Sequence, residues 1–523
     1  MKQTLDFVVS PEIGFDTDNL HQFLKEKLQI SDHAFIRLER RSIDARSKQV
    51  KVNIKVSIYE NEQAEPLGNF EKNYQDVSKK PQVIVVGAGP AGMFAALRLI
   101  ELGIKPIVIE RGKDVQARRR DLAAINKDHV VNNNSNYCFG EGGAGTYSDG
   151  KLYTRSNKRG DIRRILEILV AHGAKEEILI EAHPHIGTNK LPKIVADLRE
   201  SIIKAGGEVH FETKVVDFIL EGNSIKGVVG EKQTTTQEFI GIGVILATGH
   251  SARDIFELLH KKNVFIQNKP FALGVRIEHP QQIIDSIQYH CEQRGQYLPP
   301  ASYSLVEQVK YKGVEKGVFS FCMCPGGFIV PSATEQGEVV VNGMSPSRRD
   351  GRFANSGMVV AVDELDWKPF ESFGVLAALE FQKNIEKIAC QIGGNTQIAP
   401  AQRVVDFAEK KVSKSLLDTS YQPGLVSVDL REVLPEQIAF RLQEGLKSFG
   451  KKMKGYFTNE AQLIGVESRT SSPVSIPRDK MSYEHTQIKG LFPCGEGAGY
   501  AGGIMSAAMD GERCAEKLAE LYG

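Results

Sequence analysis

A strand–loop–helix–strand segment that begins near residue 81 restricts the possible folds of this chain more than any other feature. QVIVV at 82–86 is a continuous apolar run, GAGPAG at 87–92 matches the pattern G-x-G-x-x-G, and MFAALRLIELG continues with a helical period. A second apolar strand, IKPIVIE, ends at Glu110. Continuous apolar strands are typical of parallel sheets that are covered on both faces. The order therefore predicts a βαβ unit that binds a dinucleotide.

Each part of this fingerprint has its own physical task. Gly87 makes the tight turn, Gly89 lets backbone N–H groups approach a diphosphate, and Gly92 lets the helix pack against the sheet. The helix N-terminus presents a partial positive charge to the phosphates. Glu110 is placed to accept hydrogen bonds from a ribose, and a carboxylate there disfavours a 2′-phosphate. The alternative is a glycine turn without a ligand, and the complete strand–helix–acid context argues against it.

Two further matches to the glycine pattern, GEGGAG at 140–145 and GAGYAG at 497–502, lack this context. The first follows VVNNNSNYC, which is no buried strand, and precedes TYSDGK, which is no helix. The second follows a short strand, and the residues after it leave no room for another βαβ unit. We therefore expect one long ligand contacted at three places, because glycine turns let the backbone approach a ring system or a flexible chain closely.

The remaining sequence divides into further units, as expected for a chain of 523 residues. Residues 1–80 read as a βαββ domain with a polar linker, and 81–269 as the first part of the nucleotide-binding domain. Residues 270–390 alternate and predict an inserted β-rich substrate domain, after which 391–523 return to the nucleotide-binding domain. The predicted fold class is α/β: a doubly wound, Rossmann-like domain with this insert and a small N-terminal α+β domain.

Composition argues against several classes of partner. The net charge of +1 gives no overall field for nucleic acid or a membrane. We see no run of about 18 uncharged apolar residues and no secretory signal pattern, so we expect no spanning helix and a cytoplasmic location. Seven cysteines in so long a chain do not resemble a disulfide framework.

The N-terminal unit carries a group of basic residues that could face RNA: Arg37, Arg40, Arg41, Arg46, Lys48 and Lys51. Aromatic residues are not interleaved with them, and solvated strand faces account for the pattern. Nucleic acid is therefore not the expected partner, and a small-molecule substrate is.

Several motifs, in order, resemble those of the two-dinucleotide-fold flavoproteins, the group that includes glutathione-reductase-like and hydroxybenzoate-hydroxylase-like proteins. They are GAGPAG, ILATG at 245–249, and LFPCGEGAGYAGGIMSAAMDG near the end of the chain. FGEGGAGTYSDGKL, GVRIEHP, SFCMCPGG, NGMS and VESRTSSPV are similar to segments of a bacterial group of FAD-dependent dehydrogenases without an assigned substrate. The resemblance covers about residues 81–523 and implies one non-covalently bound FAD.

The resemblance also implies where FAD would lie. The first loop would hold the ADP half, Val215 would meet the adenine, and the A-T-G strand would run toward the cofactor. The second glycine loop would lie along the isoalloxazine, and the C-terminal loop would hold the ribityl chain and diphosphate, with Glu496 where many relatives carry Asp. The cofactor-binding residues predicted in this way are Gly87, Gly89, Pro90, Ala91, Gly92, Glu110, Arg111, Gly142, Gly143, Ala144, Gly145, Thr146, Val215, Ala247, Thr248, Gly249, Gly495, Glu496, Gly503, Ile504, Met505 and Ser506.

Four residues are candidates for catalysis. Cys322 and Cys324 lie two apart on an expected strand, so that their thiols would point the same way as a redox pair or as two small buried residues. His279 could move protons near neutral pH. Arg469 precedes the C-terminal loop and could return to the cleft, where an arginine can hold an anionic group.

These features predict an FAD-dependent oxidoreductase. The resemblance favours a dehydrogenase or reductase that transfers hydride between a small substrate and the flavin over a hydroxylating monooxygenase. The helix after the first fingerprint carries no C-x4-C pair, which argues against the disulfide reductases of this superfamily. No second fingerprint unit is available for NAD(P)H, which would have to dock transiently as a reductant. The alternative is a flavoprotein with structural or sensory FAD whose N-terminal domain binds RNA or a partner protein. The sequence carries no signal for the oligomeric state.

Overall fold

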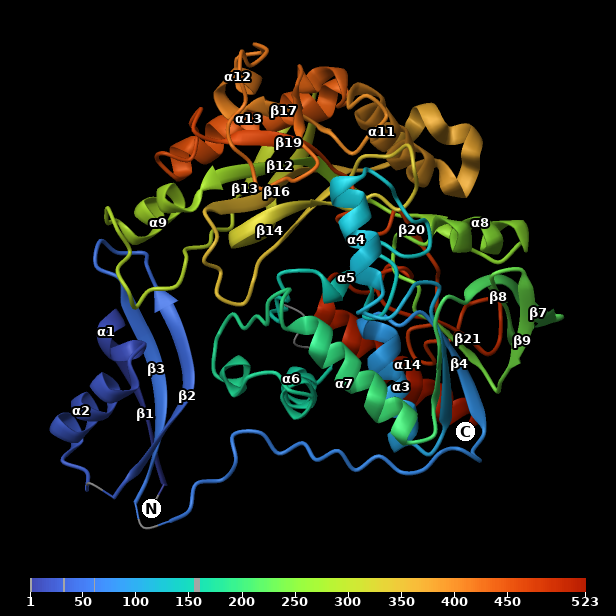
Figure 1. Ribbon diagram of the computed structural model, residues 1–523, viewed down its shortest axis with the longest axis horizontal. Helices are drawn as coiled ribbons and strands as arrows, with labels where there is room; N and C mark the ends of the chain where they lie inside the picture. Colours follow the sequence, from blue (N-terminus) through green and yellow to red (C-terminus); the bar gives the residue numbers. More distant parts are fainter. Residues whose placement is uncertain (1, 32, 61, 155–159) are drawn as a thin grey trace.

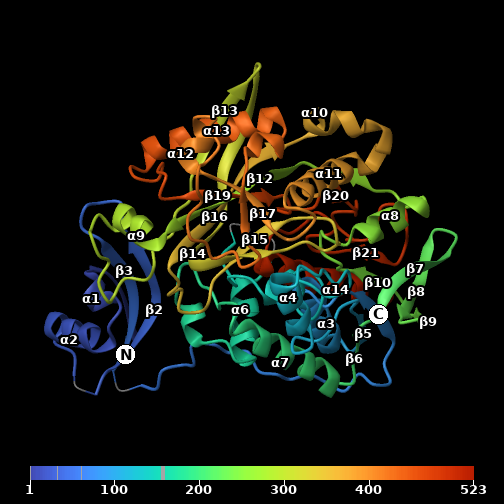
Figure 2. The same cartoon turned by 45° about the horizontal axis from the view of Figure 1, so that its top comes forward.

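The computed structural model describes residues 2–31, 33–60, 62–154 and 160–523, and Figures 1 and 2 show it from two directions. A small N-terminal unit lies at one side of the molecule. The chain then runs along the lower edge in Figure 1 to a parallel sheet, above which a larger, mainly β-stranded unit is packed. We refer to the last two as the nucleotide-binding domain and the second domain.

The N-terminal unit is an antiparallel sheet covered by two helices. Its elements are β1 (Lys2–Val9), α1 (Pro11–Gly14), α2 (Thr17–Leu28), β2 (Phe35–Asp44) and β3 (Lys51–Tyr59), with β3 in the middle of the sheet. Burial alternates along the first part of β3, as expected where one face of a strand packs and the other meets solvent. Val52, Ile54 and Val56 of β3 form a core with Leu20 and Leu24 of α2.

Strand β2 attaches this unit to the rest of the chain. The backbone of Arg41 exchanges hydrogen bonds with residues 180–182, and its side chain pairs with Glu181. Arg37 and Arg46 each pair at 2.6 Å with a carboxylate two positions away in the sequence. Three of the cations that could have faced RNA are therefore paired with carboxylates.

The nucleotide-binding domain is built on a parallel sheet of order β21-β10-β4-β5-β6. Its strands are β4 (Gln82–Val86), β5 (Lys105–Ile109), β6 (Glu208–His210), β10 (Val244–Leu246) and β21 (Leu491–Pro493). On one side lie α3 (Pro90–Glu101), α6 (Ile162–Ala171), α7 (Leu191–Lys204) and α14 (Ile504–Tyr522). On the other lie α8 (Arg253–Lys261) and the antiparallel strands β7 (Lys214–Glu221), β8 (Ser224–Lys232) and β9 (Thr235–Ile240).

Both faces of this sheet are covered, which explains the apolar run at 82–86. Val83 and Val85 pack toward the helices α3, α7 and α14, whereas Ile84 and Val86 pack toward α8 and β7–β9. The mixed α/β class with a Rossmann-type sheet is thus confirmed. Among the described residues, none of the helices combines the length and the apolar character needed to cross a bilayer.

The second domain is a mainly antiparallel sheet of order β13-β14-β16-β12-β19-β17-β18, with β15 paired to β14. Its strands are β12 (Phe271–Pro280), β13 (Val306–Tyr311), β14 (Val314–Pro331), β15 (Val341–Met344), β16 (Phe353–Val362), β17 (Ala399–Arg403), β18 (Leu425–Ser427) and β19 (Gln462–Glu467). Its helices are α9 (Gln281–Tyr289), α10 (Glu364–Trp367), α11 (Ala377–Ile392), α12 (Val404–Ala408) and α13 (Glu436–Lys452). Its short 3-10 turns are η2 (Lys368–Leu376) and η3 (Leu430–Glu432), and a further one, η1 (Glu176–Leu179), lies in the nucleotide-binding domain.

The predicted boundary of the insert at residue 390 is wrong. Strand β19 pairs with β12 and β17, so the sheet of the second domain continues to Glu467. Residues of α11 and α13 belong to the same hydrophobic core as those of β12 and β16. The helical pattern of these segments was correct, but such a pattern does not say which sheet a helix covers.

The chain enters and leaves the second domain through two neighbouring strands. β11 (Gln267–Asn268) and β20 (Val474–Ser475) pair antiparallel, with Gln267 opposite Ser475 and Asn268 opposite Val474. The insert therefore begins and ends at one place on the nucleotide-binding domain.

Candidate functional site

A cavity of about 410 Å³ lies where the carboxyl ends of the parallel strands meet the second domain. In open α/β sheets, ligands bind at this end of the strands. The nucleotide-binding domain lines the cavity with residues from 86–91, 109–111, 138–154, 213–215, 247–255 and 494–507. The second domain contributes Phe321, Cys322, Asn342, Arg469 and Thr470.

The first glycine loop joins β4 to α3, and each glycine is required for a different reason. Gly87 has a φ of +104°, which favours glycine. A Cβ on Gly92 would lie 1.9 Å from the Gly87 carbonyl oxygen, so Gly92 serves the packing of α3 and does not line the cavity. A Cβ on Gly89 would meet no heavy atom within 4 Å. Gly89 therefore leaves open space in front of the N-terminus of α3, at Pro90 and Ala91.

Glu110 lines the cavity and also ties its loops together. Its carboxylate accepts backbone N–H groups from Ala88 at 2.9 Å, Gly112 at 2.8 Å and Gly140 at 2.9 Å. These bonds link the first glycine loop to the second. The predicted contact with a ribose would add to this structural role, since a carboxylate offers about four acceptor positions.

The second glycine loop packs directly onto the first. It follows α4 (Arg118–Lys127) in the chain and leads into the short helical turn α5 (Gly143–Thr146). A Cβ on Gly143 would lie 3.2 Å from the Gly89 Cα, and one on Gly145 would lie 3.1 Å from Pro90 Cγ. Gly143, Ala144 and Gly145 line the cavity.

Two predicted cofactor residues of this second loop are turned away from the cavity. Gly142 donates its N–H to the Ala88 carbonyl oxygen at 2.8 Å. The Thr146 hydroxyl donates to the Glu141 carbonyl oxygen at 2.8 Å. Both residues therefore shape the loop instead of lining the cavity, and their spacing in the sequence does not distinguish the two roles.

The third glycine loop packs against the A-T-G turn. A Cβ on Gly497 would lie 2.6 Å from the Gly249 carbonyl oxygen. Ala247, Thr248 and Gly249 line the cavity, and so do Glu496 and the start of α14 from Gly503 to Ser506. Gly495 does not line it and instead donates its N–H to Asp510 at 2.8 Å. The three glycine segments thus meet around one space.

Two helix N-termini face this space without a side-chain cap. The residues at the N-cap positions of α3 and α14 are Gly89 and Gly503, and neither helix has a side-chain hydrogen bond at its cap. The first N–H groups of a helix have no partner within the helix, and with the helix dipole they favour an anion. Together with the open space at Gly89, this arrangement fits the diphosphate of a dinucleotide such as FAD.

Glu496 and His250 lie next to each other in the wall of the cavity. Their side chains approach to 3.5 Å. Burial raises the pKa of Glu496. Burial, together with Arg469 and Arg253, lowers the pKa of His250 to about 4. His250 is therefore neutral at neutral pH and can act as a hydrogen-bonding group at this wall.

The placement of His279 corrects the sequence-based assignment to catalysis. The side chain is fully buried in the second domain, and its Nε2 lies 2.8 Å from the Tyr456 carbonyl oxygen. It does not line the cavity. Burial lowers the pKa of His279 to about 4, so the ring is a neutral core group. The strand pattern did not reveal this, because β12 is buried on both of its faces.

We expect His279 to make the folded state less stable in acid. The unfolded chain takes up a proton on this residue near pH 6.5, whereas the folded chain does so only near pH 4. Stability is therefore present above the unfolded pKa and is lost as pH falls, by about 2 kcal/mol between pH 7 and 5. His279→Asn can still donate to Tyr456, so urea unfolding of the FAD-free variant should depend less on pH. His33→Asn, at an exposed position, is the control and should leave the pH dependence unchanged. Equal slopes in the two variants would contradict this assignment.

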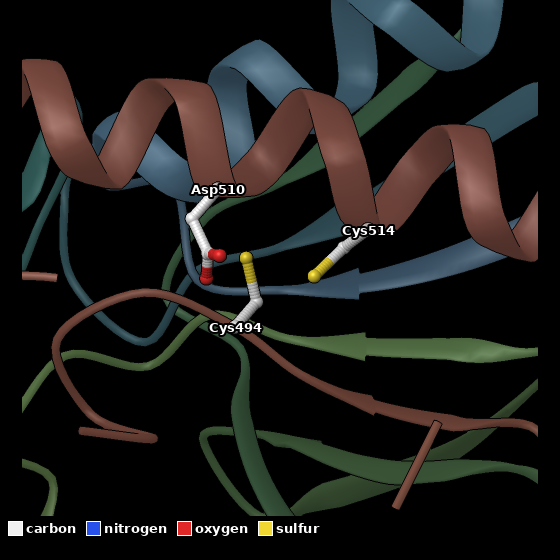
Figure 3. Close-up of side chains that lie close together, drawn as sticks. All are labelled: Cys494, Asp510 and Cys514. Carbon is white, nitrogen blue, oxygen red and sulfur yellow. The ribbon is translucent and has the colours of Figure 1, made fainter. Parts of the chain in front are cut away.

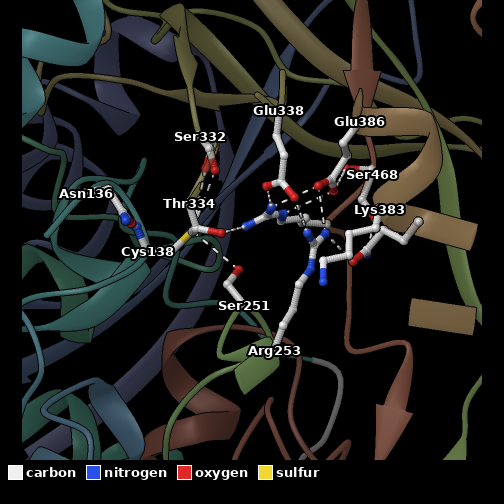
Figure 4. A network of polar contacts seen from close by, with 12 residues as sticks. Asn136, Cys138, Ser251, Arg253, Ser332, Thr334, Glu338, Lys383, Glu386 and Ser468 are labelled. Atoms are coloured by element: carbon white, nitrogen blue, oxygen red, sulfur yellow. Dashed lines mark hydrogen bonds and ion pairs between the residues drawn. The ribbon is translucent and has the colours of Figure 1, made fainter. Parts of the chain in front are cut away.

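Arg469 belongs to a buried network of charges between the two domains, and Figure 4 shows Arg253, Glu338 and Glu386 of this network. Arg253 of α8 lies 2.5 Å from Glu338 and 2.7 Å from Glu386. Arg469 approaches the same carboxylates at 2.8 and 2.9 Å, and it also donates to Thr334 at 2.6 Å. Its side chain touches the cavity, but its donors are directed to protein acceptors. This geometry favours a role in joining the domains over a role on the substrate.

Cys322 and Cys324 lie in the second domain, at the wall that faces the second glycine loop. Cys322 is exposed and lines the cavity, whereas Cys324 is buried behind it. Lys151, which the sequence reasoning missed, lies next to both thiols and lines the cavity as well. Lys151 is the last residue of the segment SDGK at 148–151, which follows GEGGAG. A cation this close to a glycine loop was the sequence signal that could have identified it.

A second pair of cysteines lies beneath the third glycine loop (Figure 3). Ligand atoms of Cys494, Asp510 and Cys514 lie within 4.8 Å of one another. The Arg478 guanidinium lies 3.0 Å from Asp510 and 3.2 Å from the Cys514 sulfur. A cationic side chain thus already compensates the charge of this cluster. The cluster holds the Gly495 backbone in place and is not assigned as a metal site.

Family comparisons agree with this division of the chain. Residues 80–240 match the family described as FAD binding domain. Residues 270–470 match the family described as FAD-dependent protein, C-terminal domain-like, and residues 1–59 match a domain of unknown function.

Individual relatives are similar to this chain over different lengths. An uncharacterized protein of Clostridium beijerinckii is 40% identical over 528 residues, which is 97% of each chain. A thiamine thiazole synthase of Aeropyrum pernix is 30% identical over 185 residues, 33% of this chain and 56% of that protein. Among solved structures, the flavin-dependent brominase Bmp2 aligns with a TM-score of 0.38 at 13% identity, over 84% of this chain and 79% of the other.

Proposed function

We propose that this chain, which belongs to the FAD-dependent flavoproteins of the two-dinucleotide-fold group, is a dehydrogenase or reductase that acts on a small molecule in the cavity described above. The observation that carries the proposal is the meeting of three glycine segments and two uncapped helix N-termini around one cavity. FAD, when bound there, would supply two-electron chemistry as hydride transfer at its flavin.

The residues of the nucleotide-binding domain divide into three sets by the part of FAD that they would hold. The N-termini of α3 and α14 would bind the diphosphate. Glu110 and Val215 lie at the end of the cavity formed by β5 and β7 and would bind the adenosine. Gly143 to Gly145, Thr248 and Glu496 would border the flavin and its ribityl chain. Bonds between protein and FAD are non-covalent in this proposal.

The second domain would close the reacting part of the cavity and exclude water. Phe321 supplies an apolar surface, and Asn342 supplies an amide. Lys151 of the nucleotide-binding domain faces this wall and supplies a cation, whose pKa is raised by the thiols of Cys322 and Cys324 and by Asp149 against the opposing effect of burial. An apolar surface beside an amide and a cation suits a substrate that has both an apolar part and an electron-rich group. NAD(P)H would reach this space only transiently, as a reductant.

The purified protein is expected to contain one FAD per chain and to lose the colour of the oxidised flavin on anaerobic addition of NADH or NADPH. The cause is the enclosed contact between a docked nicotinamide and the bound flavin. Absorbance in a stopped-flow instrument measures the rate, and free FAD at the same concentration is the control. A bound flavin that reacts no faster than free FAD with either nucleotide would contradict the nicotinamide part of the proposal. A protein that takes up no FAD would contradict all of it.

A further inference from the structure

An irregularity in β14 presents Cys322 to the cavity. The pairing of β14 with β16 shifts register between Phe321 and Cys324. Cys322 has a φ of +47°, in the left-handed region that a non-glycine residue seldom adopts. Such strain persists where the surrounding structure holds it, and it gathers at functional sites. The two thiols therefore lie together because of this bulge, and not because of the regular strand pleat expected from the sequence.

Two cations hold this bulge in place and face its sulfurs. Lys151 Nζ lies 3.8 Å from the Cys322 sulfur and 4.0 Å from the Cys324 sulfur, and it also donates to the Met323 carbonyl oxygen. The buried guanidinium of Arg276 lies 3.7 Å from the Cys324 sulfur and donates to the Cys322 carbonyl oxygen at 2.7 Å. Both sulfurs are thus within 4 Å of one ammonium group.

The surroundings shift the pKa values of the two thiols in opposite directions. Interaction with the Cys324 thiol lowers the pKa of Cys322 well below its usual value, and Lys151 and Arg276 add to this effect. The same interaction, together with burial, raises the pKa of Cys324. Cys322 is therefore the more acidic thiol of the pair, and Cys324 is the less acidic one. The charged groups that face Cys322 are Lys151, Arg276, Asp149, Glu467 and Glu496.

We infer that Cys322 and Cys324 form a redox-active dithiol in the cavity wall, whose reaction partner is a small disulfide. The pair differs in position from a C-x4-C pair on the helix after the first fingerprint, because it comes from the second domain. The exposed thiolate is the group that attacks, and the buried thiol behind it is the group that resolves. Lys151 and Arg276 are positioning residues that stabilise the thiolate form.

The reaction balances without another reagent. The Cys322 thiolate attacks one sulfur of R–S–S–R′, a Cys322–S–S–R bond forms, and R′–S⁻ leaves and takes the proton of Cys324. The Cys324 sulfur then attacks the Cys322 sulfur and expels R–S⁻. The small disulfide gains two electrons, and the protein pair loses them as a Cys322–Cys324 disulfide. Return of this pair to the dithiol rests on the proposed oxidoreductase function, which would supply two electrons through FAD.

The test uses the purified full-length protein with its flavin oxidised and no reductant present. The probe is 5,5′-dithiobis(2-nitrobenzoate), an aromatic disulfide that releases a coloured thiolate. The wild-type protein should release two equivalents in a fast phase, and mass spectrometry should find a peptide with a Cys322–Cys324 disulfide. C324S should release one fast equivalent and retain the probe on Cys322. C322S should lose the fast phase.

A matched control and a charge variant complete the experiment. C291S changes a partly buried cysteine outside the cavity and should behave as wild type. K151M should slow the fast phase at least tenfold at pH 7 and move its pH profile upward, because a cation at this distance lowers a thiol pKa by about 1–3 units. Brief labelling of wild type with iodoacetamide should modify Cys322 first, a result that needs no variant.

The outcomes separate this inference from the proposed function. A wild-type protein whose fast phase equals that of C322S, or labelling that spares Cys322, would overturn the inference even if NADPH reduces the flavin. A fast, two-equivalent exchange in a protein whose bound flavin reacts no faster than free FAD would support the dithiol site and contradict the nicotinamide part of the proposed function.

Discussion

Replacing Gly89 by glutamate is expected to leave the protein folded and to abolish FAD binding. Gly89 has an ordinary φ of −75°, and a Cβ there meets no heavy atom within 4 Å, so the backbone and its neighbours need not move. The new carboxylate would occupy the open space before the N-terminus of α3, where the diphosphate is proposed to bind. Placing like charges against each other costs several kcal/mol, so affinity for FAD should fall by at least roughly 100-fold.

Fluorescence titration of the FAD-free protein with FAD measures this loss, and circular dichroism monitors the fold. Gly317→Glu is the matched control. Gly317 lies in β14 away from the cavity, and an added Cβ would come no closer than 3.6 Å to another residue. If Gly89→Glu binds FAD as tightly as this control, the diphosphate does not lie at the first loop. Loss of the fold in Gly89→Glu would show that the space at Gly89 is not open.

Glu386→Gln is expected to destabilise the second domain by about 3–5 kcal/mol, the usual cost of removing one partner from a buried ion pair. Glu386 is fully buried between Arg253 and Arg469. Burial alone would raise the pKa of Glu386, but the two guanidinium groups hold it at about 2, so the carboxylate is charged throughout the neutral range. Its loss leaves two buried cations with Glu338 as their single carboxylate partner in this network (Figure 4).

Trp367 makes this prediction measurable for the second domain alone. It is the one tryptophan of the chain, it is buried, and it stacks on Phe271 of β12. Its fluorescence during urea unfolding should therefore report the second domain. Glu380→Gln is the control, because Glu380 lies in α11 like Glu386 but forms a surface ion pair with Lys383. Such a pair contributes at most about 0.5 kcal/mol to the free energy of unfolding. Equal shifts in the two variants would contradict the assigned role of the network.

The parts of the fold that depend on neighbouring residues were accessible from the sequence. The turn at Gly87, the apolar strand before it and the helix after it interact within about twenty residues, and their pattern predicted the parallel sheet. The meeting of the three glycine loops could also be anticipated, because two of them lack a strand and helix of their own. The structure adds that they contact one another directly, as Gly143 does with Gly89.

The features that escaped prediction join residues far apart in the chain. Lys151 meets Cys322 across 171 positions, and Arg253 meets Glu386 across 133. Neither pair has a local pattern, since the partner of a charge is set by the tertiary fold. His279 illustrates the converse, because a titratable residue in a strand covered on both faces becomes part of the core. The backbone angles of a glycine loop likewise decide which of its residues line the cavity, and a sequence pattern does not specify those angles.

The antiparallel pairing of β11 with β20 places the two ends of the second domain side by side. The chain departs at Asn268 and returns at Val474, which face each other in the ladder. Neighbouring strands lie about 5 Å apart, a gap that a tight two-residue turn can close. Removing everything between these points would thus leave an uninterrupted smaller protein. The second domain is thus an insert whose two ends meet at one point, where an engineer could exchange it.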